Sequence, residues 1–401
     1  MRILFLSRWY PYPPDNGSKL RIFNLLRALS RRHKISLLSF READDVTDEP
    51  DVERMREVCT AVRAVPYRRF RPGSAKSMVG LLSPRPRSLV DTYSPKMLAA
   101  VMDEYQRNGC DVLIASQLDM VPYALALPKV PSILEEVELA VYRDAMHRSG
   151  NIRSRLRAGV TWLKLSAYLR RVLPRFVACT VVSDVERAHL QQVVPGYPNV
   201  TVVPNAVDTS QYDHDYGLPQ PNTLVFTGAL TYSANHDAMR YFLEEVFPIV
   251  ARAIPEVSLR ITGKYDGVDL TSLPSRSGVE LTGYLPDIRP LVAQSWASVV
   301  PLRVGGGTRL KILESMALGT PVVSTSKGAE GLGVTSGQDI LIADDAKEFS
   351  VLLESLLHSP ALRCRLSEAA RRLVRTRYDW EVVARGINDL IEQNARSECV
   401  R

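Results

Sequence analysis

The sequence predicts an α/β protein made of two doubly wound domains, each a parallel sheet with helices on both faces. Short apolar runs alternate with stretches of helical spacing, a polar stretch at 209–222 interrupts this alternation, and the alternation then starts again. Strand–helix alternation is typical of parallel sheets, and a polar stretch rich in proline and glycine is typical of an interdomain linker. We therefore expect a first domain at 1–208, a linker at 209–222 and a second domain at 223–401, whose C-terminal helices could cross back to the first domain.

The individual elements follow from apolar runs and their spacing. In the first half we expect strands at 3–7, 34–40, 111–116, 132–136 and 178–183, a helix at 18–32, and a closing segment at 200–208. In the second half we expect strands at 223–230, 258–264, 279–284, 297–304, 321–326 and 339–344. Helices are expected at 237–253, at 308–319 with Gly319 as its end, and from 346 to about 393 with a break near Ser359. In such sheets ligands bind outside the carboxyl ends of the strands, so we expect the two domains to face a central cleft.

Composition narrows the class of protein. The chain has 401 residues, of which 45% are hydrophobic and 24% charged, which is an ordinary globular composition. No apolar run approaches the length of a membrane-spanning helix, and the short apolar N-terminus is interpreted as a first strand and not as a signal peptide. The five cysteines are far apart and odd in number, so they predict neither a disulfide framework nor a zinc site. We expect a cytoplasmic protein.

The positive charge is concentrated in the first half. Residues 1–200 hold 31 Lys and Arg against 20 Asp and Glu, whereas residues 201–401 hold 20 against 24. Residues 61–90 carry seven basic and no acidic residues, and residues 143–175 carry nine basic residues against Asp144. The second segment interleaves apolar and basic residues. It fits either a helix at the inner face of an anionic membrane or the solvated face of a core helix. The few aromatic residues do not interleave with the basic ones, so no nucleic-acid partner is expected.

The densest chemical signal lies at 301–332. Gly305, Gly306 and Gly307 follow a predicted strand, and a helix begins near Thr308. Bare glycine backbone at a helix N-terminus can bind an anion closely. Arg309 and Lys311 follow in the first turn, where cations oppose the helix dipole, so a bound phosphate or diphosphate would explain them. A tight strand–helix turn with solvated basic residues is the alternative.

Glu314 follows Lys311 on a neighbouring helical face. It could form a surface ion pair with Lys311, or it could accept hydrogen bonds from ribose hydroxyls, as acidic residues do in dinucleotide sites. Glu136 and Glu138 come after the predicted strand at 132–136 and are candidate carboxylates for an acceptor or its proton, with a solvated loop as the alternative. Asp213, His214 and Asp215 have a metal-binding spacing but lie in the linker, so no metal site is expected.

The segment GGGTRLKILESMALGTPVVST resembles the donor-binding region of glycosyltransferase family 4, whose members are retaining enzymes with the GT-B fold. The resemblance extends over most of the chain. The N-terminal ILFLSRWYPYPPDNGSKLRIFNLLRALSRR, TVVPNAVD, TLVFTGALTYSANHDAMRYFL and ELTGYLPDIRPLVAQSWASVVPLR resemble other segments of that family. The resemblance implies two Rossmann-like domains, an acceptor side in the first and a donor side in the second.

The resemblance also implies roles for individual residues. Glu314 matches the second glutamate of the family's Glu-x7-Glu motif, which holds the nucleotide ribose. Tyr284 falls where the nucleobase contacts come from, and Gly17 matches a glycine loop near the diphosphate. The backbone that faces the donor sugar and diphosphate corresponds to Gly305, Gly306, Gly307, Thr308 and Leu310. The donor would be a nucleotide-diphosphate sugar acting as co-substrate, with no further cofactor, and the acceptor would be a sugar or a lipid-linked acceptor.

Several positions depart from the family pattern. The first glutamate of Glu-x7-Glu is replaced by Gly306, and a catalytic-loop histidine is replaced by Ser116 and Gln117. The family's Gly-Arg-Leu is Gly228-Ala229-Leu230 here, and Asn235 stands near the position of a lysine that contacts the diphosphate. From charge balance we expect Arg309 and Lys311 to supply the two missing cations to the leaving group, with Glu138 as the candidate acceptor-side carboxylate.

The expected function is therefore retaining, metal-independent sugar transfer in polysaccharide, glycolipid or glycoconjugate biosynthesis. Two alternatives stay open. A GT-B epimerase or phosphorylase would share the donor site and differ in its need for an acceptor. A catalytically inactive basic binding protein would bind polyanions in a salt-sensitive manner without affinity for nucleotide sugars.

Overall fold

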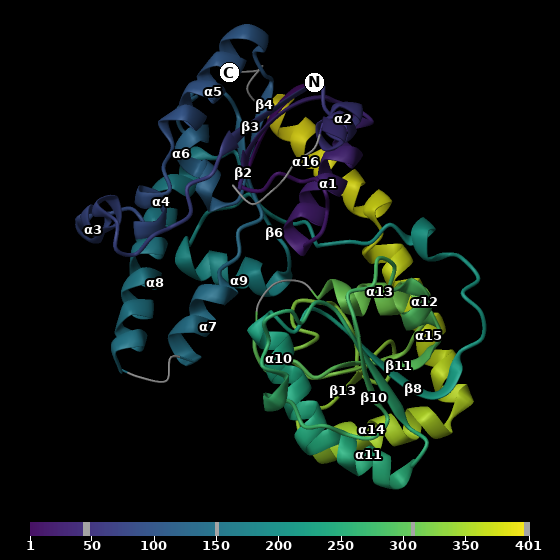
Figure 1. Ribbon diagram of the computed structural model, residues 1–401. Helices are drawn as coiled ribbons and strands as arrows, with labels where there is room; N and C mark the ends of the chain where they lie inside the picture. Colours follow the sequence, from purple (N-terminus) through teal and green to yellow (C-terminus); the bar gives the residue numbers. More distant parts are fainter. Residues whose placement is uncertain (43–48, 149–151, 306–308, 397–401) are drawn as a thin grey trace. The chain divides into compact units, whose positions relative to one another are not determined.

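The computed structural model describes residues 1–42, 49–148, 152–305 and 309–396. The chain divides into two compact units, of which unit 1 comprises residues 1–204 and 383–401 and unit 2 comprises residues 205–382. Each unit contains a parallel sheet with helices on both faces (Figure 1). The predicted class, α/β with two Rossmann-like domains, is confirmed.

Unit 1 is built on seven parallel strands in the order β3-β2-β1-β4-β5-β6-β7. Its strands are β1 (Arg2–Ser7), β2 (Lys34–Arg41), β3 (Ala61–Pro66), β4 (Val112–Ser116), β5 (Ser132–Glu135), β6 (Ala178–Val181) and β7 (Val200–Val202). Its α-helices are α1 (Gly17–Ser30), α2 (Glu49–Val58), α3 (Ala75–Leu82), α4 (Arg87–Asp91), α5 (Pro95–Asn108), α6 (Val121–Ala124), α7 (Ala140–Arg148), α8 (Ile152–Val172) and α9 (Asp184–Val193), with short 3₁₀ turns η1 (Leu118–Met120) and η2 (Leu173–Arg175). Apolar residues of β1, β4 and β5 form the centre of its core, because strands of a parallel sheet are covered on both faces.

Unit 2 is built on six parallel strands in the order β10-β9-β8-β11-β12-β13. Its strands are β8 (Gln220–Thr227), β9 (Ser258–Thr262), β10 (Val279–Gly283), β11 (Ser295–Val300), β12 (Val322–Ser324) and β13 (Leu341–Ile342). Its helical segments are η3 (Thr209–Tyr212), α10 (Ser233–Tyr241), η4 (Phe242–Val246), α11 (Phe247–Ala253), η5 (Leu270–Ser272), α12 (Arg289–Ala293), α13 (Leu310–Leu318), α14 (Ala346–His358) and α15 (Pro360–Arg377). The predicted end of α13 is confirmed, since Gly319 caps it with φ 80°.

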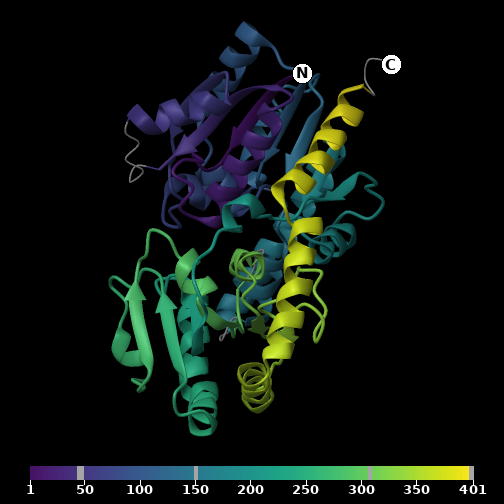
Figure 2. The ribbon, with the colours of Figure 1, turned by 90° about the vertical axis from the view of Figure 1, so that its right-hand side faces the viewer.

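The last helix, α16 (Trp380–Arg396), begins in unit 2 and belongs to unit 1 from Val383 onward. It is the helix that ends at the label C in Figure 2. Within unit 1, His33 Nε2 lies 2.9 Å from Asn388 Oδ1, and Arg32 forms an ion pair with Glu392 at 3.0 Å. These contacts attach the helix to the segment that joins α1 to β2.

Some expected elements differ from the structure. The strand β3 was not expected, because it is a partly exposed edge strand with an arginine at its centre and carries no continuous apolar run. The expected helix at 237–253 begins earlier, at Ser233, and contains the π-helical turn η4 just before Pro248, which has no backbone N–H to donate. The expected strand at 297–304 ends at Val300.

The polar stretch expected as a linker also differs in part. Its residues belong to unit 2, where Tyr212 packs against the apolar cluster around α13. The strand β8 begins at Gln220, inside that stretch. A second helix break lies at Asp379, whose carboxylate accepts hydrogen bonds from Thr209 N and Glu381 N. This break is set by contacts with a distant segment, so helical spacing alone did not reveal it.

The fold of unit 2 depends on a close approach of two strand ends, and a substitution tests it. Gly263 follows β9 with φ 132°, and a Cβ there would lie 2.5 Å from the carbonyl carbon of Gly228. We predict that Gly263→Ala destabilises the protein by about 2 kcal/mol more than Gly267→Ala, because overpacking adds about 1–3 kcal/mol to backbone strain. Gly267 is the matched control, since its φ is also positive (76°) and no atom lies within 4 Å of its Cβ position.

Urea unfolding of both variants measures the difference. Equal destabilisation by the two substitutions would contradict the close approach.

Candidate functional site

The carboxyl end of β8 is enclosed by two side chains of unit 2. Gly228 follows β8, and a Cβ at this glycine would lie 2.7 Å from Lys311 Nζ and 2.7 Å from Asn235 Nδ2. Lys311 comes from α13 and Asn235 from α10. Only a residue without a side chain fits at Gly228. Packing therefore explains why the run Gly228-Ala229-Leu230 begins with glycine.

The ammonium group of Lys311 is held by neutral groups. Its Nζ donates to Asn235 Oδ1 at 2.9 Å and lies 4.2 Å from the ring centroid of Phe226. The amide of Asn235 in turn donates to the carbonyl of Ala229. Burial, together with the nearby charge of Arg309, lowers the pKa of Lys311 to about 7. No carboxylate in the described part of the chain lies within ion-pair distance of this ammonium, so an anion would be a favourable partner for it.

Lys311 therefore lies beside Asn235, the residue that stands near the position where the family resemblance leads us to expect a lysine. The hypothesis that Lys311 forms a surface pair with Glu314 is not what the structure shows, because the two side chains have different partners. The phenol of Tyr212 donates to Glu314 Oε1 at 3.3 Å. Burial raises the pKa of Glu314 and, with the neighbouring carboxylate adding to it, the pKa of Tyr212.

The glycine loop before α13 is described in part. Gly305 has φ 105°, and its carbonyl accepts a hydrogen bond from Arg309 Nη2 at 2.7 Å. Arg309 is buried and precedes the helix as its N-cap, with ψ 78°, so it does not lie in the first helical turn as predicted. The helix begins instead at Leu310, which packs partly buried against the cluster around Ile312. The predicted residues Gly306, Gly307 and Thr308 lie outside the described part of the chain.

Tyr284 directly follows β10 at the same edge of the sheet as Gly228. Its side chain is 64% exposed, and Lys264 Nζ lies 5.3 Å from its ring centroid. An exposed aromatic ring with an adjacent cation can stack on a planar ligand. Its role toward a nucleobase stays a prediction.

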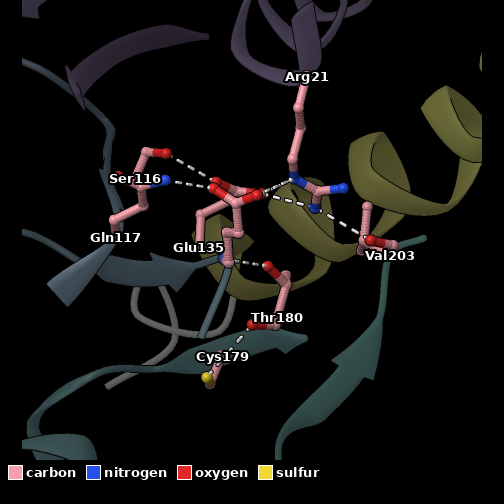
Figure 3. Close-up of polar contacts among 8 residues, drawn as sticks. Arg21, Ser116, Gln117, Glu135, Cys179, Thr180 and Val203 are labelled. Carbon is pink, nitrogen blue, oxygen red and sulfur yellow. Dashed lines mark hydrogen bonds and ion pairs between the residues drawn. The ribbon is translucent and has the colours of Figure 1, made fainter. Parts of the chain in front are cut away.

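Unit 1 carries a second polar cluster, at the carboxyl ends of β4, β5 and β7 (Figure 3). Arg21 of α1 is buried and pairs with Glu135 through Nε at 2.9 Å and Nη2 at 2.7 Å. Its Nη2 also donates to the carbonyl of Val203, and Ser116 Oγ donates to the other oxygen of Glu135 at 2.8 Å. Removing one partner of such a buried pair costs about 3–5 kcal/mol, so the cluster fixes this edge of the sheet.

Glu136 lies beside this pair in a strained conformation. Glu136 and Gln117 have positive φ values of 59° and 71°, and Gln117 Nε2 donates to Glu136 Oε2 at 2.8 Å. Burial and the charge of Glu135 raise the pKa of Glu136. Non-glycine residues with positive φ cluster at functional sites. The predicted Glu138 follows on the same segment and is half-buried.

Residues after the neighbouring strands extend this polar edge. Arg8 follows β1, and its Nη2 forms an ion pair with Glu42, after β2, at 2.7 Å. Its guanidinium lies 3.2 Å from the ring centroid of Tyr67, after β3, and burial raises the pKa of Asp119, after β4. The predicted Gly17 is the first residue of α1, where Asn16 caps the helix by accepting from Lys19 N.

Sequence reasoning missed Arg21, Tyr212 and the Arg8 group. One signal for Arg21 was present, since it shares a helical face with Leu25, Ala28 and Leu29, where a charged residue needs a buried partner. Tyr212 gave no signal, because it lies in the short 3₁₀ turn η3 and meets Glu314 only through the fold. Over the described ranges, no three His, Cys, Asp or Glu side chains are arranged to hold a metal ion.

Comparison with known proteins gives a family match. Residues 221–359 match the family model described as "Glycosyl transferases group 1". A glycogen synthase of Mycobacterium tuberculosis (strain CDC 1551 / Oshkosh) is 26% identical over 232 residues, which are 55% of this chain and 54% of that protein. A GDP-mannose-dependent mannosyltransferase of Corynebacterium glutamicum, which acts on a monoacylated phosphatidylinositol monomannoside, is 26% identical over 167 residues, 38% of this chain and 44% of that protein. The chain spans about half the length of these curated relatives.

Similar solved structures cover the chain more fully. HepE of Anabaena, solved with UDP and glucose, aligns with 98% of this chain and 100% of its own, at 15% identity and a TM-score of 0.66. Sucrose-phosphate synthase of Thermosynechococcus elongatus aligns with 98% of each chain, at 16% identity and a TM-score of 0.67. At such identities the likeness shows the fold. The fold is GT-B, and the family match of residues 221–359 agrees with the resemblance to glycosyltransferase family 4.

Proposed function

We propose that the protein is a glycosyltransferase that moves a sugar from a nucleotide-diphosphate sugar to an acceptor, with retention at the anomeric carbon and without a metal ion. The observation that carries the proposal is the Lys311 ammonium, held by the neutral Asn235 at the carboxyl end of β8, with Glu314 farther along the same helix. The relatives named as a glycogen synthase and a mannosyltransferase, and HepE solved with UDP and glucose, support it.

Unit 2 is proposed to bind the donor. When the bond between the anomeric carbon and the diphosphate oxygen breaks, its electron pair stays on the diphosphate, and cations placed beforehand stabilise that charge. Lys311 and Arg309 are proposed for this role, which needs no metal ion. Glu314 would accept hydrogen bonds from the ribose hydroxyls, Gly228 and Gly305 would let the ligand approach the backbone, and Tyr284 would contact the base.

Unit 1 is proposed to bind the acceptor, which is a sugar or a lipid-linked molecule. The acceptor hydroxyl oxygen forms the new bond to the anomeric carbon, and its proton passes to the departing diphosphate or to a carboxylate such as Glu138. The strained pair Gln117 and Glu136 supports a binding role for this edge of the sheet.

The products would belong to polysaccharide, glycolipid or glycoconjugate biosynthesis. The proposal places the enzyme in the cytoplasm, with peripheral contact to the inner face of the membrane through the basic segments 61–90 and 143–175. None of the helices in the described part of the chain has the length and apolar content that crossing a bilayer needs.

Incubation with UDP-, GDP- and ADP-linked sugars tests the function. We expect one base to stabilise the protein, by about 2.7 kcal/mol at a hundredfold excess over its dissociation constant, and nucleoside diphosphate release to require an acceptor. NMR of the product would then show the anomeric configuration of the donor. Conversion of the donor to another sugar nucleotide without acceptor would instead indicate an epimerase, and phosphate-dependent cleavage a phosphorylase. Polyanion binding without nucleotide-sugar affinity would indicate the inactive binding protein.

Lys311 predicts a pH dependence of diphosphate binding. The bound anion favours protonated Lys311, so affinity is full below the ligand-free pKa of about 7 and falls as pH rises above it, by up to about tenfold per pH unit. In Lys311→Met we expect weaker binding without this slope. Calorimetric titration with the nucleoside diphosphate measures it, and the corresponding nucleoside, which has no phosphate, is the control. The same slope in both proteins would show that another group titrates.

The proposed role of Glu314 predicts that the protein distinguishes ribose from dideoxyribose nucleotides. We expect Glu314→Gln to weaken nucleoside diphosphate binding about tenfold, since a hydrogen bond to a charged group contributes about 1.5–3 kcal/mol. The wild type should bind the 2′,3′-dideoxy form more weakly than the ribose form, and the variant should bind both alike. Fluorescence competition assays compare the four affinities. Full discrimination by the variant would overturn the ribose role.

Metal independence predicts that transfer survives chelation. We expect the initial rate of nucleoside diphosphate release to change by less than about twofold in EDTA, because side-chain cations would stabilise the leaving group. Restoration of a lost rate by Mg²⁺ or Mn²⁺ would contradict this part of the proposal.

A further inference from the structure

The helix α8 has two apolar faces, one of which has no partner within the described part of unit 1. Leu165, Leu169 and Val172 are buried in the core. Four other apolar side chains, at steps of four, four and three residues along the helix, lie on a separate exposed face: Ile152, Leu156, Val160 and Leu163. The sequence offered either a core helix or a membrane-facing helix, and the structure shows that a core face and an exposed apolar face coexist.

The helix α3 has its apolar side outward. Its buried residues are the small Ser77 and Gly80, and a Cβ at Gly80 would lie 3.2 Å from Arg87 Cγ, so only a small residue fits inside. Its large apolar residues Met78, Val79, Leu81 and Leu82 are exposed, with Leu82 at 93%. A helix of a globular protein ordinarily turns its apolar side to the core.

The two helices are in contact. Lys164 of α8 donates to the carbonyls of Gly80 and Leu81 at the end of α3, and both helices lie on the same side of unit 1 (Figure 1). Eight of the twelve exposed large apolar side chains in the described part of unit 1 belong to these two helices. We call this the α3–α8 surface, made of Met78, Val79, Leu81, Leu82, Ile152, Leu156, Val160 and Leu163.

Its charges favour one kind of partner. Arg153, Arg155 and Arg157 are exposed and alternate with the apolar residues of α8. No ion pair involves these three arginines within the described residues, and Asp144 is the lone acidic residue between 143 and 175. Exposed leucines flanked by unpaired arginines match a surface of acyl chains and anionic headgroups. A contiguous apolar patch exposed to water otherwise promotes aggregation.

We propose that the α3–α8 surface docks unit 1 on an anionic lipid membrane. Leu82, Leu156, Val160 and Leu163 would enter the headgroup–acyl boundary, while Arg153, Arg155 and Arg157 contact lipid phosphates. The inference deepens the proposed membrane contact of the enzyme, because it identifies two helices and an insertion mode that the basic segments alone do not define. It does not depend on which sugar is transferred.

Vesicle flotation of the full chain tests the docking. We expect binding to phosphatidylcholine vesicles with about 30% phosphatidylglycerol and weak binding to phosphatidylcholine alone, because each arginine near an anionic surface contributes about fivefold to the partition coefficient. Arg153→Gln/Arg157→Gln should therefore lower binding about twenty-fivefold. Leu82→Ser/Leu163→Ser should lower it at least about tenfold. The matched control is Val351→Ser, an exposed helical valine of unit 2, which should bind as the wild type does.

Other results overturn the inference. Equal binding of all variants, or no preference for phosphatidylglycerol, would exclude this surface. Concentration-dependent dimerisation that Leu82→Ser/Leu163→Ser abolishes would identify a second copy as the occupant, and salt-sensitive binding of a DNA duplex with no vesicle binding would identify a polyanion site.

Nucleoside diphosphate binding to the same leucine variant separates this inference from the proposed function. These leucines lie in unit 1 and take no part in donor binding, so stabilisation by the nucleoside diphosphate should be unchanged. Vesicle binding without nucleotide binding would leave the docking standing and overturn sugar transfer. Nucleotide binding without vesicle binding would overturn only the docking.

Discussion

Parallel strand pairing is the constraint on which the rest of this molecule depends. Every strand pair in both sheets is parallel, so all strands of a sheet end at one edge. Because both faces of a parallel sheet are covered by helices, polar chemistry can be placed at that edge with access to ligands. Arg8, Glu42 and Glu135 gather there in unit 1, and Gly228 and Gly263 gather there in unit 2.

The two units use this edge in opposite ways. In unit 1, the charge of Arg21 is buried but matched by Glu135, which rigidifies the strand ends and leaves no demand for a further anion. In unit 2, the ammonium group of Lys311 instead contacts the neutral side-chain oxygen of Asn235 and the ring of Phe226. Burial and the charge of Arg309 lower the pKa of the lysine more than the charge of Glu314 raises it, so an anionic ligand would raise that pKa again.

The elements that sequence predicts well are those whose evidence is local. The buried strands around Ile3, Ile35 and Ile114 are short apolar runs, and α13 has both apolar spacing and a terminal glycine, so each was identifiable from its own residues. The edge strand β3, the helix break at Asp379 and the partner of Glu314 depend on contacts between distant segments. Likewise, Asn235 marked a missing charge in the sequence, but the fold alone shows that Lys311 reaches it.

The roles of the basic residues in this chain can be told apart only when the partners of each residue are known. A net charge of +7 attracts phosphates, lipids and nucleic acids alike. Arg21 has carboxylate partners and is buried, so it stabilises the fold. Lys311 is half-buried among neutral partners, so it suits an anionic ligand. Arg153, Arg155 and Arg157 are exposed beside apolar side chains, so they suit an extended anionic surface. A positively charged side chain therefore has one of three roles in this chain. The burial of the residue and the group nearest to its charge decide which role it has.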